Sequence, residues 1–262
     1  MKKLIVNADD FGRTRGISRG TMHAHLHGVV TSTTALMNMP DTAQALSEVR
    51  DICPSLGVGV HLNITQGEPL LPQSQVASLV DNSGTFHKFH KKPELVNAIN
   101  LSELRAEWQA QIEKFLAFGP QPDHFDSHQH ISYFREEVMR IMLELARDYD
   151  VAVRFPADGY PNLIGRESAQ TLLQEFGVQA PQTCLTEFYG DEISIEMMVG
   201  IISTLTEGTH ELMCHPGYSD AQLDQTSVYS RQRDLELSIL TDAAIKQALR
   251  DHQVKLVSFT DL

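Results

Sequence analysis

The sequence predicts an α/β fold, namely a (β/α) barrel, regular or irregular, with a parallel β-core. Short apolar, β-branched runs recur at fairly even intervals along the 262 residues, and helical patterns lie between most of them. Strand alternating with helix about eight times implies a parallel sheet, and closure into a barrel is the natural architecture at this length. An open doubly wound sheet is the main alternative. Because no linker, repeat or low-complexity segment interrupts the chain, we expect one domain over residues 1–262.

The predicted strands are apolar runs of the kind that buried parallel strands show. In chain order they cover residues 4–6, 31–37, 56–64, 124–128, 151–155, 183–189, 211–214 and 255–260. Between Leu104 and Leu116 apolar residues follow the spacing of one buried helix face, and Ser102 is the expected cap of that helix. The same spacing predicts helices within residues 138–145 and 235–249.

The longest irregular stretch, residues 65–92, contains Pro69, Pro72, Phe86 and Phe89. Loops of this length in a compact domain are usually functional or disordered. We expect this loop to cover a binding site, with Phe86 in contact with substrate.

Composition excludes several classes of partner. Lys plus Arg total 21 against 34 Asp plus Glu, a formal charge of −13 without a basic run, which argues against nucleic acid and anionic lipid as partners. No apolar run approaches the roughly 20 residues that span a bilayer. Cys53, Cys184 and Cys214 are an odd number without metal-type spacing, as expected for free thiols in a reducing compartment. We therefore expect a cytoplasmic protein that acts on a small molecule.

Two adjacent acids, Asp9 and Asp10, stand where the first predicted strand runs out. Neighbouring carboxylates repel each other unless a cation, a shared proton or water relieves them. One interpretation is a solvated turn that caps the next helix. The other is a metal site in which one carboxylate binds the ion and its neighbour acts on what the ion activates, because strand neighbours point in different directions.

Further polar residues follow other strands at their carboxyl ends. They are His61, Asp126, His128, His130, Arg154 and His215. Strict alternation in residues 124–130 sends Asp126, His128 and His130 to one face, whereas Ser127 and Gln129 face the other. In a barrel these strand ends converge on one face, where active sites lie. Two imidazoles and a carboxylate suit Zn²⁺, Fe²⁺, Mn²⁺ or Co²⁺. A lone His at a strand end is more often a hydrogen-bonded structural group, but burying the whole 126–130 run without a partner would be costly.

On these motifs the chain resembles the YdjC-like carbohydrate deacetylases, of the chitooligosaccharide deacetylase type. The similarity rests on residues 7–12, 30–36, the His61 strand, 126–130 and 213–216, in that order. It implies that Asp10, His61 and His128 bind one divalent metal ion, Mg²⁺ or Zn²⁺. It also implies an irregular barrel and a homodimer.

The resemblance further implies that Asp9 is the catalytic base and that His215, opposite the metal, assists the leaving amine or the oxyanion. A carboxylate near His215 would raise the pKa of that imidazole and keep it charged. We also expect Arg154, Phe86, His130 and Asp126 to bind substrate. Ser132 stands where relatives often have another His.

The expected reaction removes the N-acetyl group from N-acetylglucosamine-containing oligosaccharides, either chitooligosaccharides or a phosphorylated disaccharide. The residues by themselves indicate a metal-dependent hydrolase, and the acetyl substrate comes from the resemblance. Two alternatives remain. A glycoside hydrolase would use two carboxylates about 5–9 Å apart and no metal. A sugar-binding protein without catalysis would need no base beside three ligands.

Overall fold

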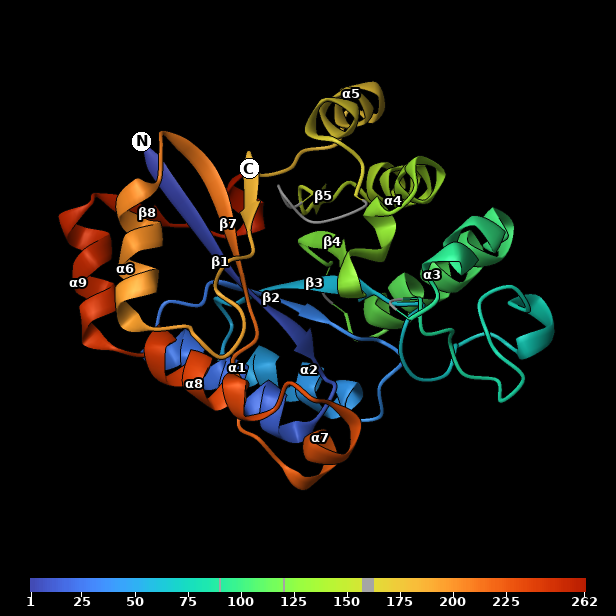
Figure 1. Ribbon diagram of the computed structural model, residues 1–262, viewed down its shortest axis with the longest axis horizontal. Helices are drawn as coiled ribbons and strands as arrows, with labels where there is room; N and C mark the ends of the chain where they lie inside the picture. The colour runs from blue at the N-terminus through green and yellow to red at the C-terminus, as the bar shows by residue number, and fades with distance from the viewer. Residues whose placement is uncertain (90, 120, 157–162) are drawn as a thin grey trace.

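The structure, a computed structural model, describes residues 1–89, 91–119, 121–156 and 163–262 (Figure 1). Its strands are all parallel and lie in the order β5-β4-β3-β2-β1-β7-β6, and β8 pairs with β1 beside this path. They are β1 (Lys2–Phe11), β2 (Ser32–Ala35), β3 (Gly57–Leu62), β4 (His124–Ser127), β5 (Ala152–Val153), β6 (Thr183–Leu185), β7 (Gly208–Cys214) and β8 (Val254–Leu256).

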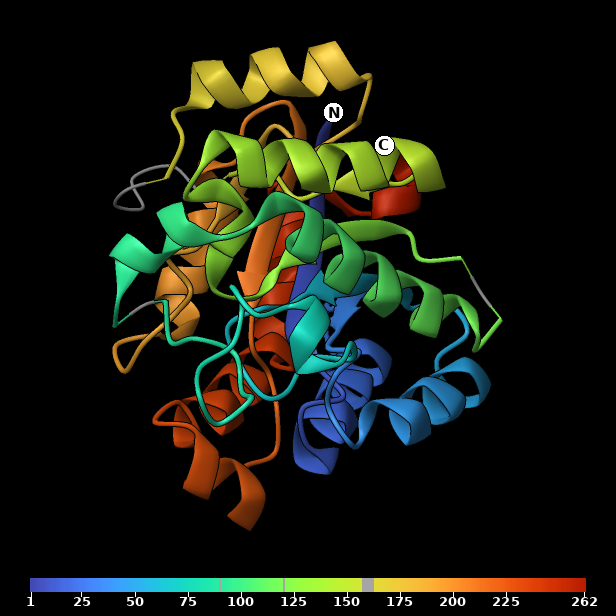
Figure 2. The same cartoon turned by 90° about the vertical axis from the view of Figure 1, so that its right-hand side faces the viewer.

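The helices lie outside this sheet (Figures 1 and 2). They are α1 (Arg15–His27), α2 (Thr42–Ile52), α3 (Leu101–Leu116), α4 (Glu136–Tyr149), α5 (Arg166–Phe176), α6 (Ile195–Thr204), α7 (Ala221–Thr226), α8 (Arg231–Leu240) and α9 (Ala243–Asp251). The arrangement confirms the predicted parallel β-core with helices around it. No helix in the described ranges is long and apolar enough to cross a membrane.

Strand β1 organises the barrel. One edge pairs with β7 over Lys2 to Ala8, and the other pairs with β8 near Lys2 and with β2 from Asn7 onward. Within the described residues no strand pairing joins β5 to β6, although the Val153 amide donates to the Gln179 carbonyl at 2.9 Å. The barrel is therefore irregular and incomplete on that side.

Two helix predictions need correction. Asn100, not Ser102, caps α3, because its side chain accepts from the amides of Ser102 and Glu103. The predicted helix at 235–249 is two helices, since the Asp242 side chain caps a new start by accepting from the Ala244 amide. Periodicity alone did not reveal this break.

The 124–130 run also departs from prediction. Strand β4 ends at Ser127, and a 3-10 segment, His128–Tyr133, follows it. Gln129 and His130 have φ of 57° and 55°, so the backbone turns left-handed and strict alternation stops. The two-face arrangement expected for these residues is therefore wrong.

The loop at 65–92 packs beside α3, and residue 90 within it lies outside the described residues. The Leu70 and Leu71 amides each donate to Glu107 of α3 at 3.0 Å. Phe86 bridges to Val80 and is fully buried. The predicted substrate contact of Phe86 is therefore corrected, because this ring forms part of the loop's own core.

Gly12, directly after β1, has a φ of +85°, and a Cβ there would lie 2.3 Å from Thr42 Oγ1 and 2.8 Å from Thr42 Cα. We expect Gly12→Ala to lower the free energy of unfolding by about 2–4 kcal/mol, through overpacking and left-handed strain. Gly200→Ala on α6, where a Cβ meets nothing within 4 Å, is the control and should be neutral or stabilising. Urea unfolding measures both, and equal stability of the two variants would contradict the argument.

Candidate active site

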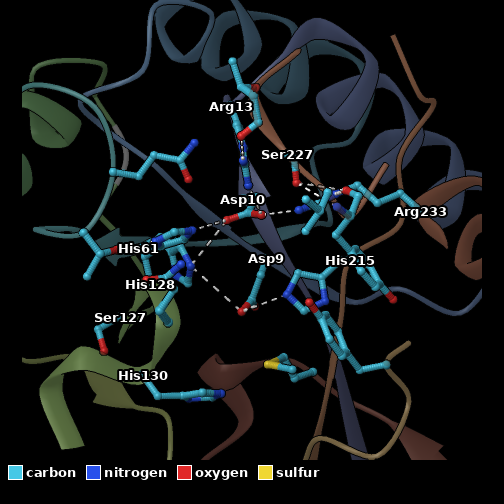
Figure 3. Close-up of a pocket in the computed structure, with 18 of the residues that line it drawn as sticks. Asp9, Asp10, Arg13, His61, Ser127, His128, His130, His215, Ser227 and Arg233 are labelled. Carbon is cyan, nitrogen blue, oxygen red and sulfur yellow. Dashed lines mark hydrogen bonds and ion pairs between the residues drawn. The ribbon is translucent and has the colours of Figure 1, made fainter. Parts of the chain in front are cut away.

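A pocket of about 540 Å³ opens at the carboxyl ends of the strands (Figure 3). Six residues predicted for the site line it, namely Asp9, Asp10, His61, His128, His130 and His215. The other three predicted residues do not. Phe86 lies in the loop core, while Asp126 and Arg154 lie fully buried beneath the pocket. The expectation that these three touch substrate is corrected by their burial.

Asp9 and Asp10 both face the pocket although they are neighbours on β1. Regular strand geometry would send them to opposite faces. The pairing of β1 with β2 shifts register between Ala8 and Phe11, and Asp10 has a φ of 71°. This bulge turns the second carboxylate back toward the first.

Three donor atoms from different strand ends converge. Asp10 Oδ1 lies 3.4 Å from His128 Nε2 and 3.7 Å from His61 Nε2 (Figure 3). Ligands about 2.1 Å from a common ion stand roughly 3.0–3.5 Å apart. The Asp10–His128 separation falls in this range and the Asp10–His61 separation lies just above it, so a small closing movement would let the three atoms hold one divalent cation. Asp10 Oδ1 is buried and accepts no hydrogen bond from any residue that the structure describes, which leaves it a lone pair for such an ion.

The second ring nitrogen of each of the two histidines already has a partner. His61 Nδ1 lies 2.7 Å from Asp126 Oδ1, and His128 Nδ1 lies 2.5 Å from Thr65 Oγ1. These contacts fix the rings with Nε2 toward the pocket, as partners of metal-binding imidazoles do. Asp126 thus orients His61.

Arginines hold the other oxygen of Asp10. Its Oδ2 accepts from Arg233 of α8 and from Arg13 at 3.3 Å. Burial alone would raise the pKa of Asp10, but Arg233, His128 and Arg13 outweigh burial and hold the pKa well below its usual range. Asp10 is therefore a carboxylate at neutral pH.

Among the described residues, it is Asp9, His61 and Asp126 that bring donor atoms within 4.8 Å of one another. We favour the set with Asp10 and His128 on physical grounds. Asp126 Oδ2 already pairs with Arg154 Nη1 at 3.1 Å, and both Asp9 oxygens bond to the same guanidinium. Asp126 is also fully buried, so an ion there would have no open position for substrate.

Arg154 is the central cation of the barrel interior. It donates to Asp9 at 2.6 and 2.9 Å and to Glu211 at 2.8 Å, and it pairs with Asp126. Burial tends to raise the pKa of Asp9, but the charge of Arg154 and its hydrogen bonds lower it overall. Asp9 is therefore also ionised at neutral pH.

His215 follows β7, as predicted, with Nε2 3.9 Å from Asp9 Oδ2. Its side chain is 13% exposed, and its backbone amide donates to Glu236. Burial lowers the pKa of His215 to about 4, more than the nearby Asp9 raises it. The expected rise is wrong, since desolvation exceeds the carboxylate's effect.

Sequence reasoning missed several pocket residues. Tyr189 and Tyr229 stack with ring centroids 4.2 Å apart beside His215, and Arg13, Arg233, Lys88 and Lys91 also line the pocket. Only Arg13 adjoins a motif. Lys88 and Lys91 come from the loop at 65–92 that was expected to cover a site, although the lysines themselves were not singled out. Tyr189 and Tyr229 come from other loops, and Arg233 comes from α8, whose sequence pattern carries no sign of a site.

His130 is pocket-lining and buried but lies apart from Asp10, beyond Ser127 in the close-up (Figure 3). We expect His128→Ala to lose bound metal and His130→Ala, its matched control, to keep it. Metal content of the purified proteins, measured by mass spectrometry, checks this. Equal occupancy in His128→Ala and wild type would remove His128 from the ligand set.

Comparison with known proteins agrees with this geometry. A model of the YdjC-like protein family matches residues 3–251. The chain is 37% identical to a carbohydrate deacetylase of Enterococcus faecalis over 100% of this chain and 98% of that protein. It is 36% identical to a chitooligosaccharide deacetylase of Proteus mirabilis, covering 99% of this chain and 98% of that protein.

Solved structures extend the likeness. An Enterococcus faecalis V583 protein named for cellobiose-phosphate cleavage superposes with a TM-score of 0.90 at 35% identity, over 99% of this chain and 98% of that one. The Xyl-CE4 domain of a multidomain xylanase from the hindgut metagenome of Trinervitermes trinervoides shares the fold alone. Its TM-score is 0.55 at 10% identity, over 99% and 88% of the two chains. With the family model matching residues 3–251 and relatives 36–37% identical over nearly their whole length, the chain belongs to the YdjC-like family.

Proposed function

We propose that residues 1–262 form one catalytic domain, a metal-dependent deacetylase that removes the N-acetyl group from N-acetylglucosamine-containing oligosaccharides. The observation that carries the proposal is the convergence of Asp10 Oδ1, His61 Nε2 and His128 Nε2 beside the Asp9 carboxylate. The names of the relatives, carbohydrate and chitooligosaccharide deacetylase, support the bond and the substrate class.

Asp10, His61 and His128 would hold the ion. When bound, a divalent ion supplies Lewis acidity to a carbonyl and to water. Two imidazole nitrogens and one carboxylate favour Zn²⁺ over Mg²⁺, which prefers oxygen ligands.

Asp9 takes the proton of the attacking water. Its carboxylate is ionised at neutral pH, and Arg154 fixes its orientation through two hydrogen bonds. Asp9 Oδ2 lies 3.9 Å from both His61 Nε2 and His215 Nε2, so it stands between the ligand set and the far wall of the pocket.

His215 stands on that far wall and protonates the departing nitrogen, because an amine anion is too poor a leaving group to depart unaided. A neutral imidazole can do this from Nε2–H provided that Nδ1 takes up a proton in the same step.

Two rival functions fit less well. A glycoside hydrolase needs one carboxyl group that can hold a proton, yet neighbouring arginines keep both pocket acids, Asp9 and Asp10, ionised. A sugar-binding protein without catalysis has no need of a buried, ionised carboxylate such as Asp9 beside three metal ligands.

Acetate release from N-acetylated chitooligosaccharides, with and without chelator, tests the proposal. We expect Asp9→Asn to lower kcat by roughly 10²–10⁴-fold, the scale of a general base, and to keep its metal. Metal content and thermal stability are measured on the same samples, because the substitution also loosens the Arg154 pair. Loss of metal together with activity would make Asp9 a ligand instead.

A phosphorylated disaccharide is the second candidate substrate. Lys88 and Lys91 line the pocket with Arg13, and among the described residues neither lysine forms an ion pair. Burial, Arg13 and Lys91 lower the pKa of Lys88, so these cations repel one another in a chain of net charge −13. A phosphate group would relieve that repulsion. The name of the Enterococcus faecalis V583 protein, with its sugar phosphate, agrees.

We expect the double variant Lys88→Ala, Lys91→Ala to raise KM for the phosphorylated disaccharide about tenfold, or 1.4 kcal/mol in binding. KM for the unphosphorylated sugar should change little. Lys92→Ala, from the same turn but outside the pocket, is the control. Equal effects on both sugars would argue against a phosphate subsite.

The proposal also includes a cytoplasmic location and a homodimer. All three cysteines are buried free thiols, which agrees with a reducing compartment. The homodimer rests on the family resemblance.

A further inference from the structure

Glu236 is a fully buried acid that the proposed reaction leaves unused. It lies on α8, three residues after Arg233, the residue that holds Asp10 Oδ2. Its Oε1 accepts from the Tyr229 hydroxyl at 2.5 Å, and its Oε2 accepts from the backbone amide of His215. One turn of α8 therefore reaches both a proposed metal ligand and the proposed acid.

The side chains of Glu236 and His215 are also close. Oε1 lies 3.9 Å from His215 Nδ1, and that nitrogen has no hydrogen-bond partner among the residues that the structure describes. A buried, unpaired ring nitrogen is costly. A movement of about 1 Å would bring the two atoms to hydrogen-bonding distance.

Groups on several neighbouring elements set the pKa of Glu236. Burial and Asp9 of β1 raise its pKa, whereas the Tyr229 hydroxyl, the His215 amide and Arg233 lower it, and the result is about 7. The buried Cys214 thiol of β7 also faces it, and Glu236 helps to raise the pKa of that thiol. Near neutral pH Glu236 thus holds a proton part of the time, while His215 is uncharged.

We propose that Glu236 is the positioning residue of His215 and the store of the proton that His215 passes on. The inference rests on the proposed deacetylation. As the C–N bond of the amide breaks, its electron pair stays on nitrogen, and His215 Nε2 gives its proton to that nitrogen. His215 Nδ1 takes the carboxyl proton of Glu236, which becomes a carboxylate. The ring ends in the other neutral tautomer, protonated on Nδ1. A solvent proton then enters at Nε2 while Nδ1 returns its proton to Glu236, which restores the starting state. The proton of the attacking water is on Asp9, so atoms and charges balance.

The pH dependence of kcat tests this. In wild type, activity should fall as pH rises through the pKa of Glu236, near 7. Tyr229→Phe removes a donor that stabilises the carboxylate, so this alkaline limb should move to higher pH. Glu236→Gln keeps an acceptor for the His215 amide but has no proton to give. The Glu236→Gln variant should show no alkaline limb, and its kcat should be roughly 10–100-fold below that of wild type with KM little changed. Tyr218→Phe, half-exposed and outside the pocket, is the matched control.

An NMR titration gives a second readout that needs no turnover. The ¹³C shift of the Glu236 carboxyl and the ¹⁵N shift of His215 Nδ1 should change with one midpoint, which Tyr229→Phe moves upward. If the alkaline limb of the kcat profile stays in place in both variants, or if the two NMR midpoints are independent, Glu236 is only a structural support. If Glu236→Gln fails to fold, Tyr229→Phe still decides. If wild type releases no acetate, the deacetylase proposal fails. The NMR titration then tests by itself whether Glu236 and His215 exchange a proton.

Discussion

The ion-pair cluster of Arg154 with Asp9, Asp126 and Glu211 is the interaction on which the site depends. A charged group this deep in a protein is strongly unfavourable unless it is paired and hydrogen-bonded. Here one guanidinium joins acids from β1, β4 and β7, and it stands directly after β5. Ion pairs therefore hold the interior of this barrel together, whereas the interiors of many barrels are packed with branched apolar side chains. Asn7 and His124 extend the cluster further, each within about 3 Å of a neighbour in it.

This cluster positions the groups that we propose to be catalytic. Arg154 keeps Asp9 ionised and holds Asp126, and Asp126 turns His61 toward the pocket. On the opposite wall of the pocket, Arg233 of α8 holds Asp10 and Glu236 of α8 accepts from the backbone amide of His215. Both acids of the Asp9-Asp10 pair thus have their own arginine partners. This arrangement explains how two adjacent carboxylates remain charged in a buried place.

The parts of the site that could be predicted lie at strand ends. His61, His215 and the acid pair stand directly at the ends of apolar runs, and the parallel topology that those runs imply brings the ends together. The left-handed backbone at Gln129 could not be foreseen, because alternation is the only rule that a strand-like pattern supplies. The sequence cannot place Phe86, because an aromatic residue in a long loop can contact either a ligand or the loop's own core, and sequence does not separate the two.

Other features depend on tertiary contacts that no local pattern records. Arg233 and Glu236 lie on a helix whose apolar spacing is ordinary, and their partners come from distant strands. The direction in which the pKa of His215 shifts depends mainly on burial, and the extent of burial is not visible in a sequence. A sequence predicts fold more readily than residue contacts, since fold follows from repeated patterns and each contact depends on the tertiary structure.

The central position of β1 has a consequence for synthesis of the protein. Asp9 and Asp10 leave the ribosome early, but Arg233, which holds Asp10, follows 223 residues later. At about 5–20 residues per second, this gap is roughly 10–45 s of translation. For nearly all of that time the acids of β1 lack the edge partner β7, and throughout it they lack the arginine of α8. A nascent chain therefore cannot assemble the centre, and hydrolytic activity begins only when the last strands have closed around the first.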